Sequence, residues 1–322
     1  MLSKLNTIGN TPMIKINYEY KGKKQYIYTK LEYYNLTGSI KDRVAYYIIN
    51  NAKKRGELKE GMPIIETTSG NTGIALAALG SFYKHPVYIF MPDWASKERI
   101  DLIKNYGANI ILFSKEEGGF IRCVEEAKRM AREKNAFLAN QFASHDNFLA
   151  HYETTAEEII KQVPEEIYGF ISGVGTGGTL MGTGKRLKDE FKDLKIVAIE
   201  PDKMPIISQG KAISQHKIEG IGDDFVPDLV DREEIDDIIL VNDNDAINMS
   251  RRLAKELGLG VGISSGANLI GSILLNQKLN KSVVTVFADD NKKYLSTDLA
   301  KEIEENLSFV SNQIKLINYE IF

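Results

Sequence analysis

Short runs of apolar residues alternate along the chain with longer segments of helical periodicity. Continuous rather than alternating hydrophobicity predicts strands that are covered on both faces, as in a parallel sheet between helices. We expect such strands at 86–90, 108–113, 168–174, 195–200 and 282–288. Helices are expected at 97–105, 121–134, 151–162, 179–191 and 245–257. The alternation predicts an α/β protein with several βα units.

A last segment, 308–322, has the apolar content of a strand and follows the final predicted helix. We expect it to pack against the rest of the fold, with contact to a second subunit as the alternative. Composition alone marks no boundary between domains, because the chain has no low-complexity linker and no long block of like charge.

The bulk composition is that of a globular protein. The 322 residues are 43% hydrophobic and 26% charged, which suits one large or two ordinary domains. A formal net charge of -3 provides no basic field, so nucleic acid and membrane partners are disfavoured. No stretch approaches the roughly 18 apolar residues of a membrane span and the N-terminus lacks the apolar region of a signal peptide, so we expect a cytoplasmic protein.

Cysteine and histidine usage gives no support to a metal or heme site. The single cysteine, Cys123, excludes an internal disulfide and is expected to be a buried thiol on a helix. The histidines lack the spacing of metal ligands. They are His85, His145, His151 and His216.

A glycine-rich loop, 173–178, follows a predicted strand and opens a predicted helix. Such a loop presents free backbone N–H groups at the positive end of a helix, which is a phosphate-binding arrangement. The loop also matches the dinucleotide-binding pattern, with Glu200 about 20 residues further on, so a nicotinamide-dependent dehydrogenase is a competing hypothesis.

A second loop, 66–73, also joins a short apolar stretch to an Ala- and Leu-rich helix. Its hydroxyl and amide groups, with the amides of the helix start, could bind a carboxylate. These groups belong to Thr68, Ser69, Asn71 and Thr72. The alternative is an ordinary helix cap, although four such groups exceed what a cap needs.

Lys41 lies where a helix is expected to begin. A lysine is electrostatically unfavourable there, because that end of the helix dipole is already positive. Lys41 is therefore either a solvated side chain paired with Asp42 or Glu32, or an amine that forms a Schiff base. In the second case its pKa would be lowered by nearby positive charge and partial burial.

Eight motifs resemble, in order and over nearly the whole chain, those of the cysteine synthase and cystathionine β-synthase family. They are IGNTP at 8–12, NLTGSIKDR at 35–43, ETTSGNTGIALA at 66–77, QF at 141–142, AHYETTAEEI at 150–159, GVGTGGT at 173–179, EGIG at 219–222 and GISSGAN at 262–268. Against this series the dehydrogenase becomes a remote alternative, as does a binding protein that has kept the fold and lost catalysis.

The resemblance implies a pyridoxal 5'-phosphate (PLP) enzyme of fold type II, which is the two-lobed, tryptophan synthase β-like α/β fold. Each lobe would be a mainly parallel sheet flanked by helices. Residues 1–35 and 149–322 would form the larger, cofactor-binding lobe, and residues 36–148 the smaller, mobile lobe. By the same resemblance the protein would be a homodimer with a small amino acid as its substrate.

The resemblance also implies roles for individual residues. Lys41 would form the Schiff base with the cofactor and then act as acid and base at the α-carbon. Asn71 would bond the phenolic oxygen of the ring, and Ser264 would contact the pyridine nitrogen. The phosphate would be held by Gly175, Thr176, Gly177 and Thr179. The substrate carboxylate would be bound by Thr68, Ser69, Thr72 and Gln141.

Three places depart from the cysteine synthase pattern. Leu36 stands where many members have proline, a change expected to alter only the stiffness of the loop. Asp290 and Asn291 stand where the family has serine and glycine. Asp223 and Asp224 stand in EGIGDDFVP, where cysteine synthases resemble EGIGAGFIP and cystathionine β-synthases EGIGYDFIP. Asp223 fits neither group, and in the family this loop borders the substrate.

A carboxylate at this loop favours water as the nucleophile. Sulfide is largely anionic at neutral pH, so a carboxylate would repel it without helping as a base, whereas water needs a base. Our hypothesis is that Asp223 activates water and the enzyme converts L-cysteine to L-serine and hydrogen sulfide. The alternative is that Asp223 points to solvent and the enzyme is an O-acetylserine sulfhydrylase, has cystathionine β-synthase activity, or is a dehydratase.

Overall fold

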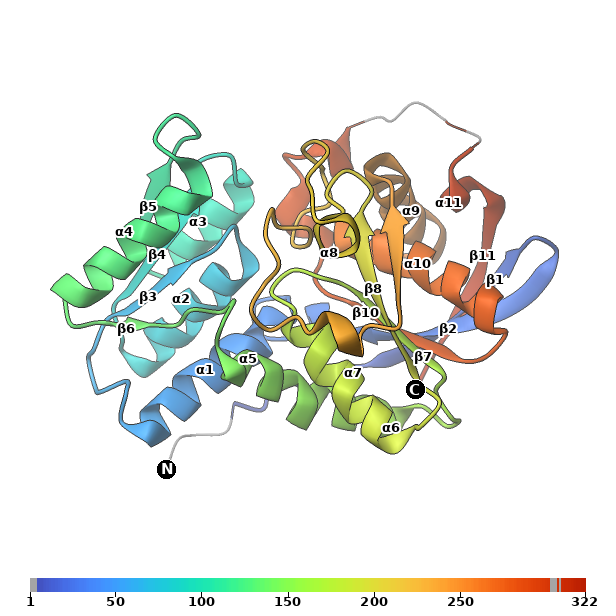
Figure 1. The fold of residues 1–322 in the computed structure, drawn as a ribbon, viewed down its shortest axis with the longest axis horizontal. Coiled ribbons are helices and arrows are strands. Elements are labelled where there is room, and N and C mark those ends of the chain that lie inside the picture. Colours follow the sequence, from blue (N-terminus) through green and yellow to red (C-terminus); the bar gives the residue numbers. More distant parts are fainter. Residues whose placement is uncertain (1–4, 302–305, 307) are drawn as a thin grey trace.

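The chain forms two sheets that lie side by side, each between layers of helices (Figure 1). This computed structural model describes residues 5–301, 306 and 308–322. The α/β class predicted from the alternation of apolar runs and helical segments is confirmed.

The larger sheet has seven strands in the order β11-β1-β2-β10-β7-β8-β9. β1 pairs antiparallel with both of its neighbours, β11 and β2. From β2 across β10, β7 and β8 to β9, each strand pairs in parallel with the next. The strands are β1 (Met13–Tyr20), β2 (Lys23–Leu31), β7 (Gly169–Gly173), β8 (Lys195–Pro201), β9 (Asp237–Val241), β10 (Val283–Phe287) and β11 (Ile314–Ile321). The segment predicted to pack against the fold therefore does so, because β11 extends the sheet beside β1.

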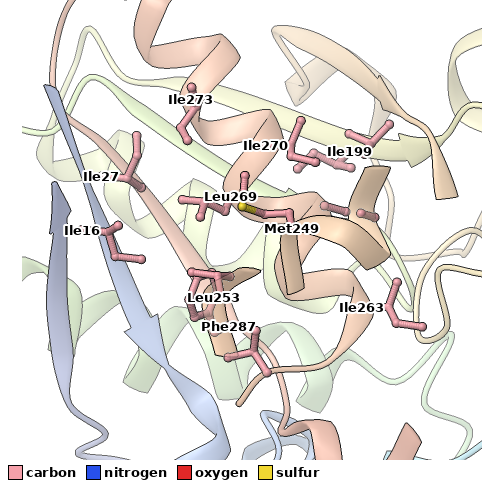
Figure 2. Close-up of a cluster of buried hydrophobic side chains, with 14 of the residues drawn as sticks. Ile16, Ile27, Ile199, Met249, Leu253, Ile263, Leu269, Ile270, Ile273 and Phe287 are labelled. Atoms are coloured by element: carbon pink, nitrogen blue, oxygen red, sulfur yellow. The ribbon is translucent and has the colours of Figure 1, made fainter. Parts of the chain in front are cut away.

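Helices α9 (Asp243–Leu257) and α10 (Ile263–Leu279) cover one face of this sheet, while α6 (Ala156–Gln162) and α7 (Gly178–Glu190) cover the other. Figure 2 shows side chains of α9 and α10, among them Leu253 and Ile270, packed against strand residues such as Ile16 and Ile199. Each fully buried aliphatic side chain of this kind contributes about 1.5–3 kcal/mol.

The smaller sheet has four parallel strands in the order β5-β4-β3-β6. They are β3 (Ile64–Thr67), β4 (Val87–Pro92), β5 (Asn109–Phe113) and β6 (Phe137–Leu138). Helices α1 (Lys41–Arg55), α2 (Asn71–Tyr83) and α3 (Lys97–Asn105) pack on one face, and α4 (Gly119–Glu133) packs on the other. These strands all lie within 36–148, and the exact lobe boundaries stay a prediction.

One predicted helix differs from the structure. The segment 151–162 belongs to a longer helix that begins with α5 (His145–Ala150), passes through a π-helical turn (His151–Thr155) and ends with α6. The remaining short helices are α8 (Ile206–Gln209) and α11 (Val310–Gln313). A π-helical turn is uncommon and often lies at a functional site, which fits the position of His151 beside the glycine-rich loop.

Candidate active site

A cavity of about 710 Å³ lies between the two sheets, at the carboxyl ends of β3, β7 and β10. This is the edge of parallel sheets where ligands ordinarily bind. All twelve residues proposed from the sequence line this cavity. They are Lys41, Thr68, Ser69, Asn71, Thr72, Gln141, Gly175, Thr176, Gly177, Thr179, Asp223 and Ser264.

Lys41 is the first residue of α1, as predicted, and lies in the cavity wall. Burial lowers the pKa of its amine to about 8, although the nearby carboxylates Asp223 and Asp289 act in the opposite direction. Of the two expected causes, burial therefore acts as predicted, whereas the expectation that nearby positive charge lowers this pKa is wrong. An amine with a pKa near 8 is partly neutral at physiological pH, as a nucleophilic lysine requires.

The alternative of a solvated Lys41 paired with Asp42 or Glu32 is also wrong. Asp42 accepts hydrogen bonds from the backbone and hydroxyl of Thr37, at 2.8 and 2.6 Å. Glu32 is fully buried and pairs with Arg43 at 2.7 Å. Both carboxylates therefore have other partners.

The glycine-rich loop ends at Gly177, which precedes α7 and has a φ of 85° that favours glycine. A Cβ at Gly175 would lie 2.5 Å from the carbonyl oxygen of Gly220, so only glycine fits there. The hydroxyl of Thr176 accepts a hydrogen bond of 2.8 Å from Asn147. The loop thus presents backbone N–H groups and a fixed hydroxyl at the start of a helix, which suits a phosphate.

Glu200 does not act as the dinucleotide pattern requires. It is buried, and its two carboxylate oxygens accept the backbone N–H groups of Ile207 and Ser208, at 2.6 and 3.0 Å. Glu200 therefore caps the start of α8, and the loop lacks the acidic partner of a dehydrogenase.

The loop after β3 lines the cavity with its polar side chains. Helix α2 begins after Gly70 without a side-chain cap, so the cap alternative is wrong. Gln141 is fixed beside this loop, because it accepts from the Thr72 hydroxyl at 2.5 Å and donates to the Thr67 carbonyl at 3.2 Å. The Gln141 backbone N–H donates to buried Glu66, whose pKa burial raises to about 7.

Asn71 of α2 and Ser264 of α10 both line the cavity. Asn71 donates to Asp289 at 2.7 Å, while its buried carbonyl oxygen has no partner among the described residues. The Ser264 side chain is 5% exposed, in the first turn of α10.

Three wall residues were not predicted from the sequence. Asp289 follows β10, and its carboxylate accepts hydrogen bonds from Asn71 and from the hydroxyl of Tyr294. The Tyr294 ring stacks on the guanidinium of Arg99, 4.6 Å from the ring centre. Of these three residues, only Asp289 could have been found from the sequence, because it follows a predicted parallel strand at the end where ligands ordinarily bind.

Asp223 lies in the cavity wall and not in solvent. Burial raises the pKa of its carboxyl to about 6, the negative charge of Asp224 raises it further, and Lys41 lowers it. Asp224 also borders the cavity but is exposed. Asp223 is therefore a stronger base than an ordinary aspartate and is still ionised at neutral pH.

The second departure from the cysteine synthase pattern has a structural explanation. Asp290 accepts a hydrogen bond from the backbone of Lys292 at 3.0 Å and so caps the helical turn after β10. Asn291 packs against Gly260: a Cβ added to Gly260 would lie 2.9 Å from the side-chain oxygen of Asn291.

The cavity fits a phosphorylated aromatic aldehyde that bonds to an amine. It offers an unpaired lysine, a phosphate loop, and an unpartnered polar atom on Asn71 between them. The family model described as "Pyridoxal-phosphate dependent enzyme" matches residues 4–289. The chain belongs to this family. PLP is thus its cofactor, and the predicted membership in the cysteine synthase-like group, of fold type II, is confirmed.

Relatives of this PLP-dependent enzyme act in sulfur amino acid metabolism. A probable cysteine synthase of Bacillus subtilis is 40% identical over 298 residues, which are 91% of this chain and 95% of that protein. A crystal structure of a hydrogen sulfide-producing enzyme from Fusobacterium nucleatum is 48% identical, with a TM-score of 0.94 over 98% of this chain and 97% of that one. A second structure of that enzyme, an Asp-to-Asn variant, holds an α-aminoacrylate intermediate.

The comparisons establish a β-replacing PLP enzyme of sulfur amino acid metabolism. In the described part of the chain, no cluster of His, Cys, Asp and Glu side chains could hold a metal ion. None of the described helices is both long and apolar enough to cross a membrane. Cys123 is buried on α4, as expected.

Proposed function

We propose that this enzyme converts L-cysteine and water to L-serine and hydrogen sulfide, with Asp223 as the general base. The observation that carries the proposal is the half-buried carboxylate of Asp223 in the same cavity wall as Lys41. Its raised pKa, caused by desolvation, supports a role as base at neutral pH. The likeness to a hydrogen sulfide-producing enzyme supports it.

The residues of the chain would divide the work as follows. The bound cofactor supplies an electron-withdrawing ring that stabilises negative charge at the substrate α-carbon. Lys41 removes the α-proton and returns it at the end. The substrate carboxylate is held by Thr68, Ser69, Thr72 and Gln141. The cofactor is held at its ring by Asn71 and Ser264, and at its phosphate by Gly175, Thr176, Gly177 and Thr179.

Electrostatics support water over sulfide as the incoming group. The cavity wall holds five carboxylates and four cationic side chains, and Asp223 and Asp224 lie together in one loop of it. Negative charge there repels a hydrosulfide anion and favours its departure, whereas neutral water enters freely and gives a proton to Asp223. The second candidate is sulfide addition to O-acetylserine, which the identity to a probable cysteine synthase favours.

Replacement of Asp223 by Asn tests the proposal, because Asn keeps the shape of the side chain and removes the base. Steady-state serine formation from cysteine should fall by about 10²–10⁴-fold. The first turnover should still release sulfide, since that step does not use Asp223. Unchanged serine formation in this variant would overturn the proposed function, and cysteine formation from O-acetylserine and sulfide by the wild type at a higher rate would favour the second candidate.

Three expectations from the resemblance remain predictions. We propose that the protein is a homodimer, which its mass in solution tests. A cytoplasmic location and the lobe boundaries at residues 36 and 148 are likewise proposed, and limited proteolysis at those boundaries tests the latter.

A further inference from the structure

The loop that carries Asp223 is fixed by hydrogen bonds on either side of residues 223–226. Gly222 donates to the Val174 carbonyl at 2.9 Å and its own carbonyl lies 2.7 Å from a ring nitrogen of His216. At the other end Pro227 is buried and receives the N–H of Val230 at 2.9 Å. Between them, no hydrogen bond joins residues 223–226 to any other described residue.

Phe225 gives this free stretch its contact with the other half of the molecule. Its ring lies 5.1 Å from that of Phe142, at an interplanar angle of 65°. Phe142 in turn meets Phe120, the second residue of α4, at 6.0 Å and 85°. Both distances and angles are those of favourable edge-to-face aromatic pairs.

Phe120, Phe142 and Phe225 thus form an aromatic row that runs from the cavity to the loop of Asp223. Phe120 and Phe142 line the cavity and belong to the part of the chain that forms the four-stranded sheet, whereas Phe225 does not line it and lies between β8 and β9 of the seven-stranded sheet. Phe142 is also the neighbour of Gln141, whose side chain is fixed by Thr72. The row therefore links the loop of Asp223 to the segment proposed to bind the substrate carboxylate.

We propose that Phe225 is a positioning residue that holds Asp223 at the substrate β-carbon by docking on Phe142 when the cavity closes. This inference rests on the proposed function, because it explains how Asp223, the proposed general base, is held in position. Phe225 touches no reacting atom, and its contribution is to the addition of water only. The removal of the α-proton and the departure of sulfide depend on Lys41 and proceed without it.

Loss of the contact between Phe225 and Phe142 should change the product from serine to pyruvate. When water is not delivered to the β-carbon, the three-carbon unit leaves as pyruvate and ammonia. Cysteine and water then give pyruvate, ammonia and hydrogen sulfide in place of serine and hydrogen sulfide, with the same total of atoms and no net oxidation. The ratio of serine to pyruvate therefore reports the position of Asp223.

The test is the variant Phe225→Leu in the PLP-loaded enzyme, with serine, pyruvate and sulfide measured together. Misplacement of a catalytic group by about 1 Å lowers its rate by up to about a hundredfold, so we expect serine formation to fall roughly ten- to a hundredfold and the pyruvate share to rise. First-turnover sulfide release and the visible cofactor absorbance should stay at the wild-type level. The acid limb of serine formation should move to lower pH, because Asp223 becomes more solvated.

Phe82→Leu is the matched control, because Phe82 is 51% exposed on α2, pairs only with its neighbour Tyr83 among the aromatic rings described, and does not line the cavity. It should leave the ratio of serine to pyruvate unchanged. An unchanged ratio in Phe225→Leu, or a parallel fall of serine and first-turnover sulfide, would overturn the inference. Asp223→Asn separates the two claims: if it too leaves serine unchanged, the proposed function fails as well.

Discussion

At the scale of single residues, burial sets the chemistry of the cavity more than charge does. The pKa of Lys41 falls and that of Asp223 rises for the same reason, since each would be charged in a poorly solvated wall. The two values, about 8 and about 6, lie on either side of neutrality. The amine and the carboxylate are thus both close to the pH at which each can exchange a proton.

The pH dependence of serine formation follows from Asp223. Its carboxyl must be ionised to accept a proton from water after sulfide has left, so kcat for serine formation should fall as the pH drops below about 6 and level off above it. In Asp224→Asn the neighbouring negative charge is absent, which lowers the pKa of Asp223. The acid limb of the kcat profile should then move to lower pH, and a limb that does not move would assign it to another group.

At the scale of elements, a buried set of charges fixes the start of α1, which carries Lys41. Arg43 donates to Glu32 at 2.7 Å and to Glu158 at 2.6 Å. Lys30 of β2 donates to Glu158 at 2.8 Å, so the four charges balance. The set joins β2, α1 and α6 in the first turn of α1, two residues from Lys41.

Removal of Arg43 should destabilise this junction strongly. In Arg43→Met the fully buried Glu32 loses its main partner, and an uncompensated buried charge costs about 3–5 kcal/mol. Thermal unfolding of the PLP-free protein measures the effect. Arg129→Met is the control, because Arg129 is 55% exposed and solvent screens its ion pairs on α4. Equal losses of stability in the two variants would contradict this account.

The sequence predicted those helices and strands whose apolar pattern is visible within the segment itself. Strands β4, β5, β7, β8 and β10 and helices α3, α4, α7 and α9 lie where the apolar runs and helical periods predict them. β1 and β2 were missed, because both are rich in polar and charged residues. Lys30 is buried in β2 only because Glu158, far along the chain, supplies its charge partner.

At the scale of the whole molecule, Arg99 joins the two halves. It lies on α3 beside the small sheet, is 3% exposed, and forms an ion pair with Glu219 from the other half. It also stacks on Tyr294, and a Cβ at Gly70 would lie 2.4 Å from its side chain. Arg99 therefore packs against Gly70 and supports the loop after β3, which is proposed to bind the substrate carboxylate.

Loss of Arg99 should weaken closure of the cavity around the substrate. A hydrogen bond to a charged group contributes about 1.5–3 kcal/mol, which is roughly a ten- to hundredfold change in a closing equilibrium. In Arg99→Met the KM for cysteine should rise by a similar factor. Arg122→Met, which removes exposed ion pairs on α4, should leave KM unchanged. A rise in both variants would mean that net charge, and not this contact, controls substrate binding.

The site itself was predicted to the extent that its residues sit in short motifs. The lysine, the two loops and Ser264 were found in this way, and the cavity brings them together. The network of Asp289, Tyr294 and Arg99 was missed, because its members come from separate segments with no motif in common. Their link exists only after folding.

The pairing of β1 with β11 also orders events during synthesis. Ile14 pairs with Ile321, so the outermost strand of the seven-stranded sheet is translated after every other strand in it. The four-stranded sheet comes from one continuous segment and can form while the rest is still on the ribosome. Until the last strand arrives, the edge of β1 has no partner strand, and an unpaired strand edge of this kind can pair with other chains.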